Sequence, residues 1–74
     1  MSHQTLDMSG HNCPMPILKT KQALTAMNAK DTIEVICTDK GSTKDFIAFC
    51  NQTGSVLISH REQDNYFIFH IEKS

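Results

Sequence analysis

Two prolines, Pro14 and Pro16, follow Cys13 closely and constrain the fold more than any other feature of the sequence. Proline lacks a backbone N–H and its φ is fixed near the helical value, so within a helix it is tolerated in the first turn. The segment Cys13-Pro14-Met15-Pro16 therefore predicts the start of a helix. Because Pro16 disfavours helical geometry at Met15, this helix can begin at Pro14 or only at Pro16. In either case Cys13 is expected at the surface, just outside the first turn.

Residues on both sides of this motif complete the first two elements. Residues 3–8 alternate weakly and predict a short strand, and residues 9–12 form a turn. After the prolines, an apolar stripe at helical spacing extends the helix to about residue 27 or 28. The members of the stripe are Ile17, Thr20, Ala23, Leu24 and Met27.

Three later segments alternate between apolar and polar residues and predict strands, at 32–38, 55–62 and 66–72. The last two are joined by a hairpin at 63–65. Shared faces are expected for Ile33, Val35 and Cys37, for Val56 and Ile58, for Phe67, Phe69 and Ile71, and for Tyr66, Ile68 and His70.

A second helix is expected between the strands at 32–38 and 55–62. Residues 42–45 match a capping box, in which the Ser42 hydroxyl accepts from the backbone N–H three residues on and the Asp45 carboxylate reaches back. Gly54 is the expected end of the helix, because glycine adopts the left-handed conformation at little cost.

The predicted order β-α-β-α-β-β fits an α/β (α+β) two-layer sandwich, with a four-stranded mixed sheet and two helices on one face. With 74 residues, the chain has room for one domain, covering 1–74. A domain of this size has a thin core, so we expect its chemistry at the surface and completed by a partner. Tyr66 and Ile68 would lie on the face opposite the helices, which a partner could use.

Charge and cysteine content exclude several classes of protein. Seven Lys and Arg residues against eight Asp and Glu residues give a net charge of −1, which argues against nucleic-acid binding. No apolar run has the length of a membrane span, and the N-terminus lacks a signal-peptide pattern. Three widely spaced cysteines do not make a disulfide framework. We therefore expect a monomer with reduced thiols in the cytoplasm.

Cys13 is the candidate reactive residue. A helix N-terminus stabilises a thiolate and lowers the pKa of a cysteine placed there. A low pKa helps sulfur transfer, because the thiolate attacks the donor and later serves as the leaving group. The alternative is a small buried core residue, the usual role of a free cysteine, but the flanking prolines favour the reactive role. Cys37 and Cys50 lie on apolar faces and are expected in the core.

Other polar residues admit plainer interpretations. His11 lies two residues before Cys13, but no C-x-x-C or H-x-x-x-H spacing is present, so a metal site is not expected. Lys19 and Lys21 could form a basic rim near the thiol or be solvated helix residues. Asp39 could meet a partner.

The stretch from Leu6 to Pro16 resembles the opening of the TusA/SirA family of small sulfur-carrier proteins. In that family a strand leads to a glycine three residues before a cysteine, and Cys-Pro-x-Pro then opens the first helix; Gly10 and Cys13 match this spacing. The resemblance extends over nearly the whole chain. Ser42-Thr43-Lys44-Asp45 and Phe49-Cys50 resemble the start and body of the family's second helix.

The resemblance implies a β-α-β-α-β-β sandwich, similar to the C-terminal domain of translation initiation factor three, and a sulfurtransferase that carries a persulfide on Cys13. It implies a sulfur donor such as a cysteine desulfurase or rhodanese-like protein, and an acceptor such as a DsrE-like protein. It implies no bound cofactor. Members of the family serve tRNA thiolation, sulfur oxidation or molybdenum-cofactor pathways.

The chain departs from the family's pattern at three places. Some members have an acidic residue in place of Met15, many have Pro-Gly in place of Ala29-Lys30, and many have proline in place of Lys40. Met15 and Lys40, with Lys19, Lys21 and Asp39, are the expected partner-docking residues.

Two other functions compete with a sulfur carrier. In the first, the chain is a non-catalytic interaction or regulatory module, and the Cys-Pro-Met-Pro segment is only a rigid start of a helix. The second is an RNA-binding domain, by analogy with the translation-factor fold, but fold does not fix function and the charge of −1 counts against it.

Overall fold

The computed structural model describes residues 3–12 and 14–74. The elements occur in the predicted order β-α-β-α-β-β. Their bounds are β1 (His3–Met8), α1 (Met15–Ala26), β2 (Thr32–Cys37), α2 (Ser42–Thr53), β3 (Val56–Gln63) and β4 (Tyr66–Glu72).

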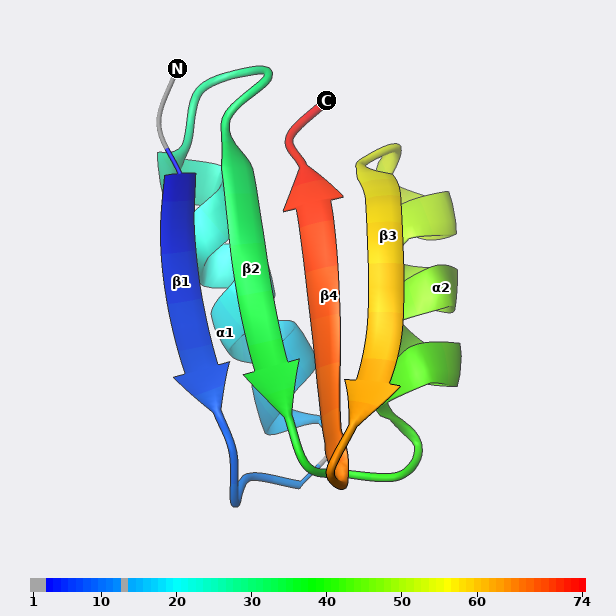
Figure 1. The fold of residues 1–74 in the computed structure, drawn as a ribbon. Helices are drawn as coiled ribbons and strands as arrows, with labels where there is room; N and C mark the ends of the chain where they lie inside the picture. Colours follow the sequence, from blue (N-terminus) through cyan, green and yellow to red (C-terminus); the bar gives the residue numbers. More distant parts are fainter. Residues whose placement is uncertain (1–2, 13) are drawn as a thin grey trace.

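The four strands form one mixed sheet in the order β1-β2-β4-β3. β1 and β2 are parallel, whereas β4 is antiparallel to both of its neighbours. Both helices cover the same face of the sheet and leave the other face open (Figure 1). The predicted two-layer α/β sandwich is confirmed.

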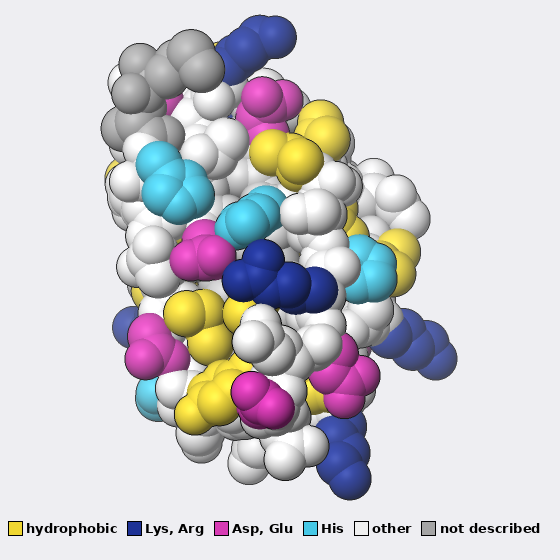
Figure 2. All heavy atoms as spheres, viewed as in Figure 1, with side chains coloured by type: hydrophobic (Ala, Val, Ile, Leu, Met, Phe, Trp, Pro, Cys, Tyr) yellow, Lys and Arg dark blue, Asp and Glu magenta, His cyan; other side chains and the backbone are white. Residues whose placement is uncertain are grey.

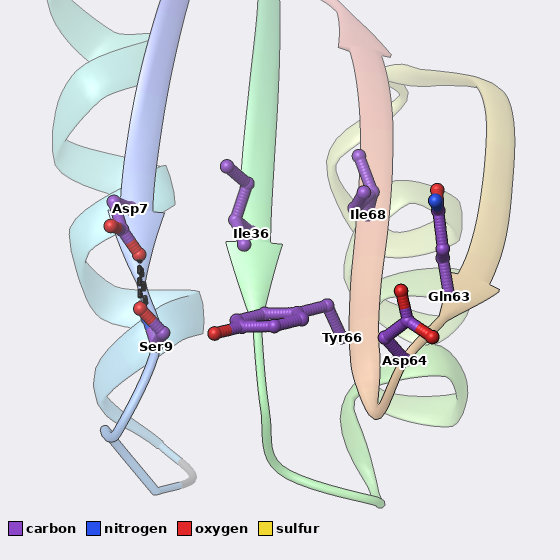
Figure 3. A pocket seen from close by; sticks show the side chains of 7 residues that line it. All are labelled: Asp7, Ser9, Ile36, Gln63, Asp64, Tyr66 and Ile68. Atoms are coloured by element: carbon purple, nitrogen blue, oxygen red, sulfur yellow. Dashed lines mark hydrogen bonds between the residues drawn. The ribbon is translucent and has the colours of Figure 1, made fainter.

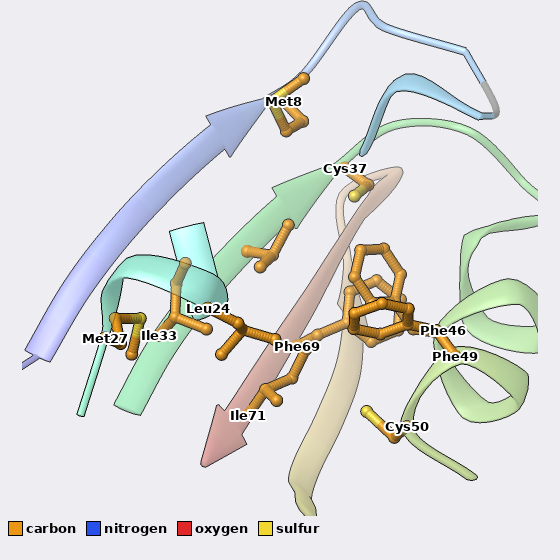
Figure 4. Packing of buried hydrophobic residues seen from close by; sticks show 11 residues of the cluster. Met8, Leu24, Met27, Ile33, Cys37, Phe46, Phe49, Cys50, Phe69 and Ile71 are labelled. Carbon is orange, nitrogen blue, oxygen red and sulfur yellow. The ribbon is translucent and has the colours of Figure 1, made fainter. Parts of the chain in front are cut away.

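The core lies between the sheet and the helices (Figure 4). Within it, the rings of Phe46 of α2 and Phe69 of β4 stack with their centroids 4.5 Å apart. Phe49 meets the edge of Phe46. The face of β2 predicted to be apolar is fully buried, as are Ile71 and the Phe69 side chain. Burial of this face fixes the register of the sheet, because a slip of one residue would expose every apolar side chain on it.

A β-bulge in β3 interrupts the alternation expected for that strand. The register shifts between Leu57 and Ser59, around Ile58. Leu57 packs against the core, whereas Val56 is 49% exposed and Ile58 is 53% exposed. An extra residue on one strand changes the face to which the following residues point.

The start of α2 differs from the predicted capping box. Gly41 is the N-cap residue, and no side chain caps the helix. The Ser42 hydroxyl donates to the backbone carbonyl of Asp39 at 2.6 Å instead of accepting from the helix. The prediction was wrong because the helix starts one residue early. Ser42 is then already inside the first turn, too far along to cap it.

The remaining helix ends follow the expected chemistry. α1 begins at Met15 with Pro14 as its N-cap residue, between the two starts that the prolines allowed. Gly54 ends α2 in the left-handed conformation with φ of 80°, as predicted.

Two turns use residues other than glycine at positive φ. In the β3–β4 hairpin, Asp64 and Asn65 have φ of 52° and 68°. This is the type I′ pattern that suits the twist of a two-residue hairpin. Lys30, in the turn before β2, has φ of 75° and donates its backbone N–H to the carbonyl of Lys73 at 2.9 Å.

Candidate functional site

The loops that carry the candidate residues gather at one end of the molecule. The β1–α1 loop, the β2–α2 loop and the β3–β4 hairpin all lie there (Figure 1). Both helices begin at this end, with Pro14 and Gly41 as N-cap residues. Helix N-termini carry partial positive charge and free N–H groups. This end therefore offers a field that favours an anionic group such as a thiolate.

The first half of the β1–α1 loop is held by hydrogen bonds at both ends of a tight turn. The Ser9 hydroxyl and backbone N–H both donate to the Asp7 carboxylate. Both bonds lower the pKa of Asp7, and the bond from the Ser9 hydroxyl has the larger effect. The backbone N–H of Gly10 donates to the Thr38 hydroxyl at 2.8 Å, which ties this loop to the β2–α2 loop.

Gly10 acts through its backbone conformation. Its φ is 83°, a value that side chains rarely adopt, and a Cβ there would meet no atom within 4 Å. The glycine is therefore needed for the left-handed turn and not for space. The resemblance suggested Gly10 as a supporting residue, and the turn gives that role a physical basis.

The second half of the loop leads into α1. The backbone N–H of Met15 donates to the carbonyl of Asn12 at 2.9 Å, and that of Leu18 donates to the carbonyl of Pro14 at 3.0 Å. Asn12 and Pro14 are both exposed, whereas Pro16 is buried. Pro16 thus anchors the first turn of the helix in the core, while Pro14 faces solvent beside the predicted nucleophile.

Cys13, the predicted nucleophile, lies outside the described residues. The sequence places it directly between Asn12 and Pro14, the exposed residues that lead into the start of α1.

The other two cysteines are in the core, as predicted. Cys37 is fully buried, and burial raises the pKa of its thiol to about 11, against the opposing effect of a hydrogen bond with Ser42. Cys50 is 5% exposed, and burial raises its pKa as well. The thiolate is the reactive form of cysteine. Neither residue is therefore suited to nucleophilic chemistry near neutral pH.

The structure brings some of the predicted docking residues together and separates others. Met15 is 38% exposed at the start of α1. Lys40 is exposed and Asp39 half-buried in the β2–α2 loop at the same end. Lys19 is exposed one turn along α1. Lys21 instead borders a hollow with Thr53 and the C-terminal residues, away from this end.

A shallow groove between the two helices begins beside the motif. It has a volume of about 230 Å³, and its lining residues are Pro14, Ile17, Asp45, Ala48, Phe49 and Gln52. Sequence reasoning missed this groove because it depends on how the helices pack.

The described part of the chain has neither a cluster of metal-binding side chains nor a helix that could span a membrane. Residues 3–12 and 14–74 contain no cluster of three His, Cys, Asp or Glu side chains arranged to hold a metal ion. Neither α1 nor α2, the helices of those residues, has the length and apolarity that a membrane span requires.

Comparison with known proteins identifies close relatives. Residues 4–73 match the family described as Sulfurtransferase TusA. The sulfur carrier protein TusA of Allochromatium vinosum is 51% identical over 71 residues, which cover 96% of this chain and 93% of the relative. The sulfur carrier protein TusA of Pseudomonas putida is 34% identical over 68 residues, covering 92% and 85%.

A solved structure supports the fold. The crystal structure of a SirA-like protein from Desulfitobacterium hafniense has a TM-score of 0.83 to this chain. The matched region covers 93% of this chain and 95% of the SirA-like chain, with 22% sequence identity.

Proposed function

The chain belongs to the TusA family of sulfur carriers, and we propose that it accepts a sulfane sulfur as a persulfide on Cys13 and passes it to an acceptor protein. The observation that carries the proposal is the contrast among the three cysteines. Cys37 and Cys50 are buried with raised pKa values. Cys13 remains as the cysteine for the chemistry, in the segment that leads into an exposed helix N-terminus.

The proposed reaction is two thiol–persulfide exchanges. In the first, the Cys13 thiolate attacks the outer sulfur of a donor persulfide, an S–S bond forms on Cys13, and the donor's inner sulfur leaves as a thiolate. In the second, an acceptor thiolate attacks the outer sulfur on Cys13, and the Cys13 thiolate leaves. No net oxidation occurs, and a low pKa favours Cys13 both as attacking group and as leaving group.

The residues around Cys13 support both steps. The N-terminus of α1 favours a thiolate over a thiol. Hydrogen bonds from Gly10 to Thr38 and from Met15 to Asn12 hold the loop on either side of the cysteine. The exposed Met15 and the groove that starts at Pro14 offer surface on which a partner can dock beside the thiol.

The partners and setting belong to the same proposal. The donor is a cysteine desulfurase or a rhodanese-like protein, and the acceptor is a DsrE-like protein. The pathway is tRNA thiolation, sulfur oxidation or molybdenum-cofactor formation. We propose that residues 1–74 act as a single sulfur-carrier domain in the cytoplasm, without a cofactor.

The test is the intact mass of the protein after incubation with a cysteine desulfurase and free cysteine. We expect the wild type to gain one sulfur atom that a reductant removes. Cys13→Ser should gain none, and Cys50→Ala, which removes a buried thiol instead, should gain one.

A second measurement makes the result decisive. Alkylation of Cys13 by iodoacetamide at neutral pH should be faster than that of a model thiol, because the low-pKa thiol is more ionised. Slow alkylation together with no sulfur gain from either a desulfurase or a rhodanese-like donor would refute the carrier function. Persulfide on Cys13→Ser would place the chemistry on another cysteine and refute the assignment.

A further inference from the structure

The open face of the sheet has two unlike halves. In the half far from the β1–α1 loop, polar side chains bind one another. His70 contacts the Glu34 carboxylate at 2.8 Å and the Ser59 hydroxyl at 3.3 Å, and the His3 ring meets the His70 ring edge-on. These polar side chains therefore have their interaction partners within the sheet itself.

The half near the β1–α1 loop is apolar and hollow. Ile36 of β2 and Ile68 of β4 lie opposite each other in the ladder and are half-buried. The Tyr66 ring extends from β4 across β2 toward β1 (Figure 3) and is 45% exposed. Together they line a hollow of about 330 Å³, with Ser9 and Gln63 also at its edge. Apolar side chains exposed in a group, unlike single ones, commonly mark an interaction site.

Two carboxylates flank this hollow. Asp7 of β1 lies on one side and Asp64 of the hairpin on the other (Figure 3). An Asp carboxyl with the ordinary pKa of 3.8 is already ionised at neutral pH, and the hydrogen bonds from Ser9 lower the pKa of Asp7 further. Within residues 3–12 and 14–74, no Lys or Arg forms an ion pair with either group. The hollow thus presents negative charge at both sides of an apolar floor.

One basic residue of the sheet lies beside the hollow. Arg61, the only Lys or Arg in the four strands, is paired with Ile68 in the ladder. It is not among the residues that line the hollow, and within residues 3–12 and 14–74 it forms no ion pair with Asp7 or Asp64. Figure 2 shows this face: acidic and hydrophobic side chains lie in its lower part, a basic side chain crosses its middle, and further basic side chains lie at the lower edge of the view.

We propose that this hollow is a docking surface for a basic segment of a partner protein, one in which Lys or Arg alternates with apolar residues. The stem of a Lys or Arg side chain would cover Ile36 and Ile68, since such stems pack well on apolar surface. Its charge would lie between the carboxylates and over the Tyr66 ring, which adds a cation–π contact. The hollow is open and shallow, which suits a protein surface better than an enclosed small molecule.

The position of the hollow links it to the cysteine. Ser9 borders the hollow and precedes Cys13 by four residues in the β1–α1 loop. The groove between the helices lies on the other layer of the sandwich. Two partners could then approach the same loop from opposite layers. This role in sulfur relay rests on the proposed function, but the docking itself does not.

The experiment is an NMR titration of the ¹⁵N-labelled protein with the peptide acetyl-Leu-Arg-Leu-Lys-Leu-amide. We expect shifts at the backbone amides of Ile36, Tyr66 and Ile68. The acidic peptide acetyl-Leu-Glu-Leu-Asp-Leu-amide should cause none there. Asp7→Asn and Asp64→Asn should each weaken binding about two- to five-fold, the usual scale for an exposed ion pair.

The variants are chosen to remain folded. Asparagine still accepts a hydrogen bond from the backbone N–H of Ser9, and at Asp64 it tolerates the positive φ of the hairpin. Glu72→Gln removes the same charge at the far end of β4 and should leave binding unchanged. The unshifted amide spectrum of each variant elsewhere in the chain verifies its fold.

Three outcomes would overturn the inference: no shift with the basic peptide, equal shifts with the acidic peptide, or shifts confined to α1 and α2. Persulfide loading of Cys13, followed separately by intact mass, keeps the two proposals distinct. Persulfide loading without peptide binding would refute only the proposed docking surface. Peptide binding without persulfide loading would refute only the proposed sulfur-carrier function.

Discussion

Replacing Thr20 by valine should stabilise the protein. Thr20 is fully buried on the inner face of α1, and its hydroxyl oxygen has no hydrogen-bond partner among the described residues. A buried hydroxyl without a partner costs about 1–3 kcal/mol. Valine has nearly the same shape and the same β-branching, and its helix propensity is similar. Thr20→Val should therefore remove most of this cost without creating a cavity, a gain of about 1–2 kcal/mol.

The assay is urea denaturation followed by circular dichroism, with thermal melting as a second readout. The urea midpoint should rise with an unchanged slope. For a domain of this size, each kcal/mol raises Tm by roughly 4–8 °C. Thr25→Val is the matched control: it makes the same change in the same helix, but the Thr25 hydroxyl is exposed and donates to the Lys21 carbonyl at 2.8 Å. It should change stability by less than about 0.5 kcal/mol.

A result of no gain would refute this reasoning. If Thr20→Val were as stable as the wild type or less stable, the hydroxyl must be satisfied in solution, for instance by a buried water molecule. If Thr25→Val gained as much, the effect would come from valine itself and not from the missing partner.

Three further predictions concern backbone strain and titration. Lys30→Gly should raise the free energy of unfolding by about 0.5–1 kcal/mol, measured by urea denaturation. Glycine relieves the strain of the φ of 75°, and the greater entropy of glycine in the unfolded chain offsets part of this gain. A loss of stability would show that the contribution of the Lys30 side chain outweighs the strain. Burial raises the native pKa of Cys37 from 9.0 to about 11, so the stability that the neutral thiol contributes is complete below pH 9 and is lost as the pH rises toward 11. Urea midpoints measured across that range should fall for the wild type and fall less for Cys37→Ala, and equal slopes would contradict the cause. The Asp7 carboxyl should titrate below 3.8 by NMR, and Ser9→Ala should move its midpoint back toward that value, because the Ser9 hydroxyl is the larger cause of the shift; an unmoved midpoint would disprove that cause.

Local patterns predicted most of the fold. Alternation in β1, β2 and β4, the apolar stripe of α1 and the stop at Gly54 are each decided within one segment, by side-chain period or by backbone freedom. The prediction for the start of α2 was wrong because more than one nearby residue could serve as the N-cap. Asp39 accepts a hydrogen bond from the Gly41 N–H at 3.1 Å, and this local turn places the N-cap at Gly41. The sequence did not predict the bulge at Ile58, because a bulge depends on how β3 pairs with β4.

The candidate site divides in the same way. Cys13 could be chosen from the sequence, because prolines and a helix start are local signals of a helix N-terminus. The burial of Cys37 and Cys50 followed from the period of their elements. The hollow that Lys21 shares with the C-terminal residues did not, since it depends on where those residues lie against α1.

By itself, the sequence determined which elements form, which faces they bury and which cysteine is the candidate for chemistry, because period, proline and glycine act over a few residues. Only the tertiary structure decided what the elements create together. The tie from Gly10 to Thr38, the groove between the helices and the acidic hollow around Tyr66 each join segments far apart in the chain. Such contacts depend on strand order and on the packing of layers, and no local pattern encodes either.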